Sequence, residues 1–244
     1  MNTEHMIHGD MPGDKIVIEP QHERKAEKIY PLLWEMLPEG KAVVCVCGGS
    51  GVGKSEIASL LATKLTEDGI PAYVMSGDNY PHRIPMENDA ERERVYAEGG
   101  REALEAYLGS PSEIDFDLVN RILADFRAGK SPIAMKRMGR RPEEKWFDEV
   151  DFSKTRVLIL EWTHGNSDWI RGVDIPILLN STPEETLEHR RARARDKGVD
   201  SPFTTMVLQI EQEQIKKQAR KAKIIVSKAG VILSWEEYRA LMGV

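Results

Sequence analysis

The sequence contains little cysteine, with only Cys45 and Cys47 among 244 residues. The two stand in the apolar run Ala42–Cys47, where strand alternation would point both thiols to one face and make a bridge between them awkward. A free cysteine in such a place behaves as a small hydrophobic residue. This placement argues against a metal or redox site and predicts two buried strand residues.

Long apolar runs and a targeting signal are also lacking. No stretch approaches the roughly 20 apolar residues that a helix needs to cross a bilayer. Residues 1–5, MNTEH, lack the basic-then-apolar order of a signal peptide. We therefore expect a cytoplasmic protein that has no membrane partner.

An excess of basic residues is absent, since the net charge is −6 and the isoelectric point is near 5.6. The molecule as a whole would repel a polyanion such as duplex DNA, so any anion site must be local. A small charged ligand fits this balance better than nucleic acid does. The sequence leaves the oligomeric state open, a homodimer included.

Internal repeats and low-complexity tracts are missing as well. A composition of 41% hydrophobic and 30% charged residues fits one α/β domain. Residues 1–22, which contain the Pro12-Gly13 break, are interpreted as an N-terminal arm, and residues 23–244 as a single domain with its core at about 41–230. A helix is expected at about 23–37, with a break or kink at Pro31.

Apolar runs of strand length alternate with helical patterns along this domain. Helices are predicted after the first strand, over residues 119–126, and from the capping signals at Thr182, Ser201 and Ser234. Strands that alternate with helices indicate an α/β fold with a doubly wound parallel sheet, covered on both faces. The strands are predicted at residues 42–47, 71–75, 156–160, 175–179 and 223–226.

What the sequence does contain is a phosphate-binding loop, or P-loop. The pattern G-x-x-x-x-G-K-[ST] falls between the first strand and an amphipathic helix, which is the context that it needs. In such a loop the backbone N–H groups surround phosphate oxygens, the lysine reaches the β- and γ-phosphates, and the hydroxyl ligates Mg²⁺. The predicted nucleotide-binding residues are Gly48, Gly49, Ser50, Gly51, Val52, Gly53, Lys54 and Ser55.

Acidic residues follow two of the predicted strands. Asp78 falls in the crevice where doubly wound sheets bind ligands, and there it would accept the proton of an attacking hydroxyl. A turn-capping role for Asp78 is equally open. Glu161 ends its strand as the acid of a Walker B strand does, and would hold Mg²⁺ directly or through water. The candidate metal residues are Ser55, Asp78 and Glu161, and the candidate catalytic residues here are Lys54, Asp78 and Glu161.

An arginine-rich helix is predicted between Thr182 and Gly198. Arg191 and Arg195 share one face of it, whereas Arg193 lies well round the helix from them. The region at about 183–200 is interpreted as a lid that neutralises charge on the transferred phosphoryl group, with Arg191 and Arg195 as catalytic candidates. A solvated helix face is the alternative.

A second group of polar and basic residues is a candidate site for an acceptor substrate. Some of them follow Asp78 and the others precede the strand that ends at Glu161, and together they would recognise an anionic group. Solvated loop charge is the alternative. The candidates are Tyr80, His82, Arg83, Lys136 and Arg137.

In the order of these motifs, the sequence resembles the uridine kinase and phosphoribulokinase family of P-loop kinases. The P-loop, Ser76–Tyr80, Ile114–Leu118 and Arg195-Asp196 match segments of that family, while Trp162 stands where the family has glycine. The resemblance implies a nucleoside-kinase-like fold, with ATP and Mg²⁺ as cofactors. It also implies transfer of the γ-phosphoryl group to a hydroxyl of a small metabolite, such as a sugar, polyol, nucleoside-like molecule or hydroxy acid.

Two other interpretations stay open. One is a different P-loop kinase, such as an adenylylsulfate kinase that acts on a nucleotide-like anion. The other is a P-loop ATPase or regulatory nucleotide-binding protein that has no small-molecule acceptor. A GTPase switch and an ABC-type ATPase are disfavoured, because the sequence contains neither an Asn-Lys-x-Asp nor a Leu-Ser-Gly-Gly-Gln motif.

Overall fold

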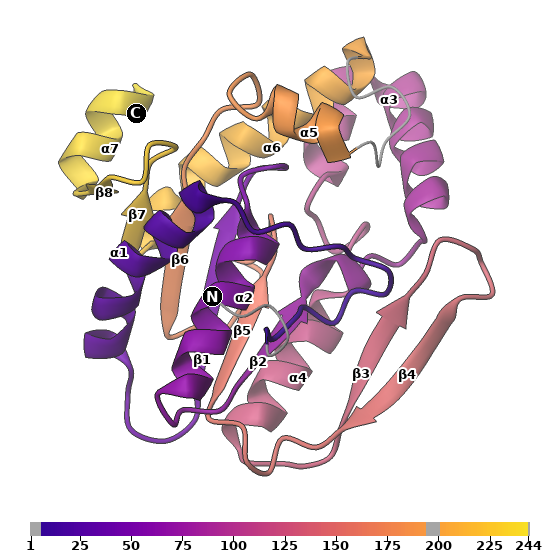
Figure 1. Ribbon diagram of the computed structural model, residues 1–244. Helices are drawn as coiled ribbons and strands as arrows, with labels where there is room; N and C mark the ends of the chain where they lie inside the picture. Colours follow the sequence, from indigo (N-terminus) through magenta and orange to yellow (C-terminus); the bar gives the residue numbers. More distant parts are fainter. Residues whose placement is uncertain (1–5, 194–200, 244) are drawn as a thin grey trace.

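A six-stranded sheet in the order β2-β5-β1-β6-β7-β8 forms the centre of the computed structural model, which describes residues 6–193 and 201–243 (Figure 1). The first five strands in this order run parallel, and β8 pairs antiparallel with β7. This confirms the predicted parallel sheet. The strands are β1 Ala42–Gly48, β2 Ala72–Ser76, β5 Val157–Glu161, β6 Ile175–Leu179, β7 Ile224–Val226 and β8 Ile232–Leu233.

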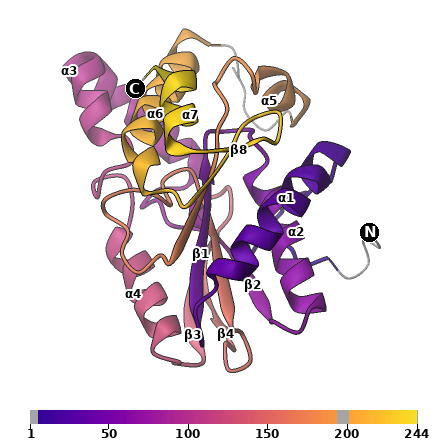
Figure 2. The same cartoon turned by 90° about the vertical axis from the view of Figure 1, so that its left-hand side faces the viewer.

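Helices cover both faces of this sheet, as the doubly wound prediction requires. Helices α1 (Pro20–Met36) and α2 (Lys54–Glu67) pack on one face, and α4 (Phe116–Arg127), α6 (Pro202–Gln218) and α7 (Trp235–Met242) pack on the other (Figure 2). Every residue of β1 is buried, which explains why its sequence is a continuous apolar run and not an alternating one. Both cysteines are buried on the α6 and α7 side, as predicted.

Helix α1 begins earlier than predicted and has no break at Pro31. It begins at Pro20, where proline suits a first turn that needs no N–H donor, and it continues past Pro31 to Met36. Ile29 and Leu33, on either side of Pro31, are both fully buried against the sheet. The burial of this apolar stripe offsets the hydrogen bond that Pro31 cannot donate.

Helix α3, the strands β3 and β4 and the short strand β8 were not predicted. Helix α3 (Pro85–Tyr107) is mostly exposed and is interrupted at Gly100, whose φ of 69° departs from helical geometry. Strands β3 (Ile133–Met138) and β4 (Lys145–Val150) form a separate antiparallel hairpin beside the main sheet (Figure 1). The remaining short elements are α5 Leu187–Arg193 and the 3₁₀ turns η2 Gly77–Asn79 and η3 Ala219–Lys221.

Residues 6–19, which we call the N-terminal segment, lie against α2 and β2. The backbone N–H of Ile7 donates to Thr63 Oγ1 of α2 at 2.9 Å, and Tyr73 of β2 donates its hydroxyl to Asp10 Oδ2 at 2.8 Å. The part of the predicted arm that the structure describes is therefore packed on the domain.

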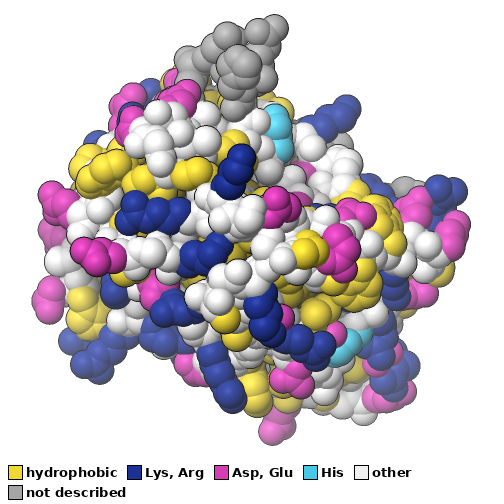
Figure 3. Space-filling view, turned by 90° about the horizontal axis from the view of Figure 1, so that it is seen from below, with side chains coloured by type: hydrophobic (Ala, Val, Ile, Leu, Met, Phe, Trp, Pro, Cys, Tyr) yellow, Lys and Arg dark blue, Asp and Glu magenta, His cyan; other side chains and the backbone are white. Residues whose placement is uncertain are grey.

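The surface mixes charges of both signs. Seen from below Figure 1, lysine and arginine side chains share the face with aspartate and glutamate side chains (Figure 3). Among residues 6–193 and 201–243, no helix has the length and apolarity that spanning a membrane would require.

Candidate active site

The P-loop joins β1 to α2 and is held open by glycine. Gly51 and Gly53 have φ values of 77° and 93°, which only glycine adopts readily. Both are also crowded, because a Cβ at Gly51 would lie 2.8 Å from Arg190 Cγ and a Cβ at Gly53 would lie 2.9 Å from His22 Nε2. The sequence therefore needs glycine here for both backbone conformation and space.

Lys54 and Ser55, the two P-loop side chains with a predicted role, lie at the start of α2. Lys54 Nζ donates to the carbonyl of Gly49 at 3.0 Å, so the ammonium group lies folded over the loop. Ser55 Oγ donates to Glu161 Oε2 at 3.3 Å. This arrangement brings the predicted phosphate lysine and two of the predicted metal residues together.

Gln212 of α6 closes the other side of the loop. Its Oε1 lies 3.6 Å from the position that a Cβ would take at Gly49. Its Nε2 is buried and has no hydrogen-bond partner within the described part of the chain. A buried donor left unpaired costs about 1–3 kcal/mol, so an anionic oxygen at this point would be stabilised. The orphaned donor, the loop and Lys54 together fit a nucleotide phosphate.

A small cavity lies beside Gln212. It is lined by Gly49, Ser50, Ser181, Thr182, Pro183, Thr186, Leu208, Glu211 and Gln212. Thr182 and Glu185 form the capping box that the sequence predicted here, with Glu185 N–H donating to Thr182 Oγ1 at 3.3 Å, but a turn follows it and helix α5 begins only at Leu187. The segment before α5 therefore forms one wall of the nucleotide side of the site.

Asp78 and Glu161 lie at the carboxyl ends of the adjacent strands β2 and β5, where Ser76 and Glu161 are paired in register. Glu161 is buried and accepts a hydrogen bond from Ser76 Oγ at 2.7 Å. Burial, and then the charge of Asp78, raise the pKa of Glu161, while Lys54 opposes the shift. Asp78 itself is exposed. The two carboxylates are thus near enough to interact, but Glu161 is buried beside Ser55 whereas Asp78 is exposed.

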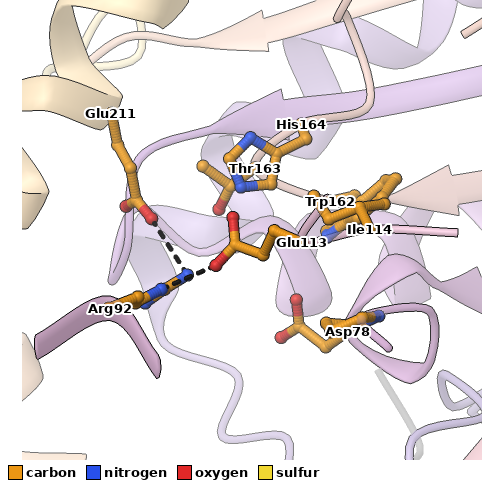
Figure 4. A pocket seen from close by; sticks show the side chains of 9 residues that line it. Asp78, Arg92, Glu113, Ile114, Trp162, Thr163, His164 and Glu211 are labelled. Carbon is orange, nitrogen blue, oxygen red and sulfur yellow. Dashed lines mark hydrogen bonds and ion pairs between the residues drawn. The ribbon is translucent and has the colours of Figure 1, made fainter. Parts of the chain in front are cut away.

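Asp78 lines a pocket, which we call the Asp78 pocket (Figure 4). Arg92 of α3 crosses its edge, with Nε 2.6 Å from Glu113 Oε1 and Nη2 3.8 Å from Glu211 Oε1 of α6. Glu211 lines both this pocket and the cavity beside Gln212, so the two adjoin. The lining residues are Asp78, Pro81, Arg92, Glu113, Ile114, Trp162, Thr163, His164 and Glu211.

The electrostatics of the Asp78 pocket are set by burial and by Arg92. Glu113 is 1% exposed, and although burial raises its pKa, Arg92 and other partners lower it overall. Burial lowers the pKa of His164 to about 4, with Glu113 opposing the shift and Arg92 and Lys54 adding to it. At neutral pH the pocket therefore holds the Glu113 carboxylate, the Arg92 guanidinium and an uncharged imidazole, while burial raises the pKa of Glu211.

The predicted acceptor residues lie elsewhere. Tyr80 is fully buried in the core beneath α4, and Arg83 donates to the Tyr107 hydroxyl at 3.2 Å. Lys136 Nζ donates to the carbonyl of Pro81 at 2.8 Å, and Arg137 pairs with Asp10 at 2.8 Å. His82 is exposed, with Nε2 3.0 Å from the carbonyl of Pro111. None of the five lines the Asp78 pocket, so the structure does not assemble the predicted basic site there.

The predicted lid is only partly described. Arg191 is exposed on α5, and Arg195 lies outside the described residues. Among the arginines of this region whose side chains the structure describes, Arg190 reaches the P-loop: its Cγ lies beside Gly51 and its Nη2 donates to the Pro183 carbonyl at 2.9 Å.

Several residues of the site escaped the sequence analysis. Arg92 belongs to the unpredicted α3, and Glu211 and Gln212 belong to a predicted helix whose inner face the sequence could not identify. For Glu113 and His164 the sequence does offer a clue. Glu113 directly precedes the matched segment that begins at Ile114, and His164 closely follows the strand end at Glu161. A search for polar residues next to known motifs would have found these two.

Comparisons with known sequences find similarity to proteins that are named as kinases. The family model for adenylylsulphate kinase matches residues 40–95, which hold the P-loop and Asp78. A protein of Mediterraneibacter gnavus, "bifunctional alpha-galactosidase/sucrose kinase AgaSK", is 47% identical over 194 residues, which are 80% of this chain and 21% of that protein. The chain thus spans about a fifth of the length of this curated relative.

Solved structures share the arrangement of the whole domain. A possible uridine kinase of Bacillus stearothermophilus superposes with a TM-score of 0.60 and 14% identity, covering 83% of this chain and 97% of that one. Phosphoribulokinase of Rhodobacter spheroides superposes with a TM-score of 0.58 and 17% identity, covering 78% of this chain and 71% of that one. At these identities the likeness concerns the fold alone.

Proposed function

We propose that this chain, which has the fold of the P-loop kinases, transfers the γ-phosphoryl group of ATP to a hydroxyl of an uncharged sugar. The observation that carries the proposal is the position of Asp78. Its carboxylate lines a pocket that adjoins the P-loop side of the site through Glu211. A hydroxyl bound in this pocket would lie between a proton acceptor and the phosphoryl donor, which is the arrangement that phosphoryl transfer needs.

Five side chains of the site would have a direct role in this reaction. The P-loop N–H groups, Lys54 and Gln212 would bind the phosphates of ATP, and Asp78 would accept the proton of the attacking hydroxyl. Ser55 and Glu161 are the residues that would hold Mg²⁺, directly or through water. When bound, Mg²⁺ neutralises charge that develops on the phosphate oxygens.

The charge of the Asp78 pocket supports an uncharged acceptor. Among the described lining residues, Asp78, Glu113 and Glu211 are acidic, and the guanidinium of Arg92 already pairs with two of them. These acidic side chains would repel an anionic acceptor. The hydroxyls of a sugar, in contrast, can donate to carboxylates and accept from Arg92. The relative named as a sucrose kinase makes sucrose the first acceptor to assay.

Adenylylsulfate kinase activity is the second candidate, because the matching family model is named for it. The match ends at residue 95, so it includes Asp78 and Arg92 but not Glu113, His164 or Glu211. It therefore supports the nucleotide half of the site more than the acceptor half. Adenylylsulfate is an anion, and the acidic pocket disfavours it.

One assay separates these functions. Product formation from Mg-ATP is followed by mass spectrometry with sucrose, glucose, fructose, uridine or adenylylsulfate as the only acceptor. We expect a phosphorylated sugar and acceptor-dependent consumption of ATP. Phosphorylation of adenylylsulfate alone would support the second candidate. A rate of ATP consumption that is the same with and without each acceptor would indicate an ATPase.

We also propose the compartment in which the reaction takes place and the class of molecule on which the enzyme acts. A kinase of this kind needs ATP and Mg²⁺, so we propose a cytoplasmic enzyme that acts on a small molecule and not on nucleic acid or at a membrane. The net charge of −6 supports this. Sedimentation analysis would decide between a monomer and a homodimer.

A further inference from the structure

Asp10, in the N-terminal segment, is a buried carboxylate with no place in the reaction as described so far. Its side chain is only 7% exposed. Its Oδ1 accepts hydrogen bonds from the backbone N–H of Ser76 at 2.7 Å and from Asn79 Nδ2 at 3.2 Å. Its Oδ2 accepts from the Tyr73 hydroxyl and from Arg137 Nη1, both at 2.8 Å. Burying a carboxylate is costly, so this full set of donors marks a specific role.

Two of these donors flank the residue that the reaction depends on. Ser76 and Asn79 are the residues on either side of Gly77-Asp78, so one carboxylate oxygen holds both ends of this turn. Asn79 is fixed a second time, because its Oδ1 accepts from the backbone N–H of Met138 at 3.0 Å. The backbone that carries Asp78 is therefore tied to the N-terminal segment and to the β3–β4 hairpin.

The opposite side of the turn is closed by packing. A Cβ at Gly77 would lie 1.9 Å from the ring of Trp162, so the turn rests directly on this indole. Trp162 and Asp10 thus confine the turn from two sides, and Asp78 is left as its exposed residue.

We propose that Asp10 is a positioning residue for phosphoryl transfer, which fixes the turn 77–79 so that the Asp78 carboxylate meets the acceptor hydroxyl. The inference rests on the proposed function. It gives the N-terminal segment a part in the active site, although none of its residues lines the Asp78 pocket.

A purely structural role for Asp10 as the counter-ion of Arg137 is the competing explanation. Arg137 is 8% exposed and has a second carboxylate partner, Asp148, at 3.1 Å. Asp148 lies on β4, and the one hydrogen bond that it accepts from Arg137 does not involve the turn 77–79. Asp148→Ala is therefore a matched control, since it removes a carboxylate from the same guanidinium and leaves the turn held.

The first test compares steady-state kinetics and ATP binding in the two variants. A displacement of about 1 Å at a reacting group can lower a rate by about 100-fold, so Asp10→Ala should lower kcat by about 10- to 100-fold. The Kd for ATP, measured by calorimetry without acceptor, should change less than about twofold, since the P-loop is untouched. Asp148→Ala should keep the kcat of the unmodified protein. Equal kcat values in the two variants would overturn the proposal.

The second test removes the positive charge of Arg137, which loses its buried partner when Asp10 is replaced. In Asp10→Ala the guanidinium of Arg137 loses a buried partner, which lowers the melting temperature. The double variant Asp10→Ala/Arg137→Met should regain melting temperature and keep the low kcat, because Ser76 and Asn79 still lack their acceptor. A kcat that recovers together with the melting temperature would show that Asp10 acts only as a counter-ion.

The third test does not depend on turnover. Deuterium uptake at residues 74–80 should be faster in Asp10→Ala than in Asp148→Ala, because the Ser76 amide loses its acceptor. Equal uptake would overturn the positioning role. If uptake differs as expected while no acceptor is phosphorylated by the unmodified protein, the proposed kinase function fails and the restraint of the turn by Asp10 stands.

Discussion

Asp78 follows strand β2 and Glu161 ends the neighbouring strand β5, but their different surroundings predict different roles. Asp78 is exposed towards its pocket, whereas Glu161 is buried and bonded to Ser55 and Ser76. Asp78→Asn should lower kcat by about 10²- to 10⁴-fold, as loss of a general base does, while the Kd for ATP stays nearly constant. Glu161→Gln should instead raise the Mg²⁺ concentration that gives the half-maximal rate.

A Mg²⁺ titration of initial rates for both variants, with Asp117→Asn of the exposed start of α4 as control, measures this difference. If Asp78→Asn shifts the Mg²⁺ requirement and Glu161→Gln does not, the two roles are reversed. If neither variant loses rate, the strand-end carboxylates are structural.

His164 predicts how stability depends on pH. Its pKa falls from an ordinary 6.5 to about 4 in the folded protein, mainly through burial. The unfolded chain therefore binds a proton at a higher pH than the native one, and stability decreases as pH falls from about 6.5 to about 4. At pH 5 this contribution amounts to about 2 kcal/mol.

Urea unfolding at pH 7 and pH 5 measures the effect, with the unmodified protein compared with His164→Asn. Asparagine does not titrate, so the variant should lose about 2 kcal/mol less than the unmodified protein over this interval. Identical losses would mean that other groups account for the acid sensitivity.

At the scale of single residues, the sequence predicted those site residues that belong to a recognisable motif. Lys54, Ser55 and Glu161 come together in the structure because a P-loop and a strand end specify their positions locally. Arg92, Glu113 and Glu211 stand outside the recognised motifs, so nothing local in the sequence marks them as partners. Arg83 and Arg137 contact Tyr107 and Asp10, partners that the fold sets, and their role at an acceptor stays a prediction.

At the scale of elements, α6 links the two halves of the site through consecutive residues. Gln212 faces the P-loop and Glu211 faces the Asp78 pocket. Gln212→Leu removes the orphaned donor that we assign to a phosphate, so the Kd for ATP should rise by about 10-fold, which corresponds to a hydrogen bond of about 1.4 kcal/mol.

Gln209→Leu is the matched control for Gln212→Leu, because Gln209 lies one turn earlier on the same helix and is exposed. Its Kd for ATP should stay unchanged. Calorimetric titration without acceptor separates the two, and equal affinities in both variants would remove Gln212 from the nucleotide site.

The strands of the main sheet were predictable because burial on both faces makes them continuous apolar runs. The β3–β4 hairpin was not, because β4, with the sequence KWFDEV, is exposed along most of its length and has no apolar pattern. Helix α3 escaped for a similar reason, since only three of its residues are buried, Asn88, Leu104 and Tyr107. Elements that bury little surface leave little periodicity in a sequence.

For the molecule as a whole, nucleotide binding should appear as thermal stabilisation. A ligand at about 100 times its Kd stabilises the native state by about 2.7 kcal/mol, which for a domain of this size raises the melting temperature by about 5–10 °C. Mg-ATP should produce this shift in the unmodified protein. Lys54→Ala should lose most of it and keep the melting temperature of the free protein, because the Lys54 ammonium group donates to the carbonyl of Gly49, which belongs to the P-loop itself and not to the core.

Differential scanning fluorimetry with and without Mg-ATP provides the measurement. An equal shift in Lys54→Ala would show that the P-loop lysine does not contribute to nucleotide affinity. A lower melting temperature of the free variant would show that Lys54 also supports the fold.

The two cysteines, finally, leave the molecule open to site-specific labelling. Cys45 and Cys47 are 0% and 1% exposed, and the Cys47 thiol together with burial raises the pKa of Cys45. Maleimide dyes react with exposed thiolates, so the native protein should stay unlabelled. Cysteines introduced at exposed Trp146 of β4 and exposed Glu188 of α5 would then carry a fluorophore pair without prior removal of any native thiol. Energy transfer between the dyes would report whether the hairpin and α5 approach one another when substrates bind.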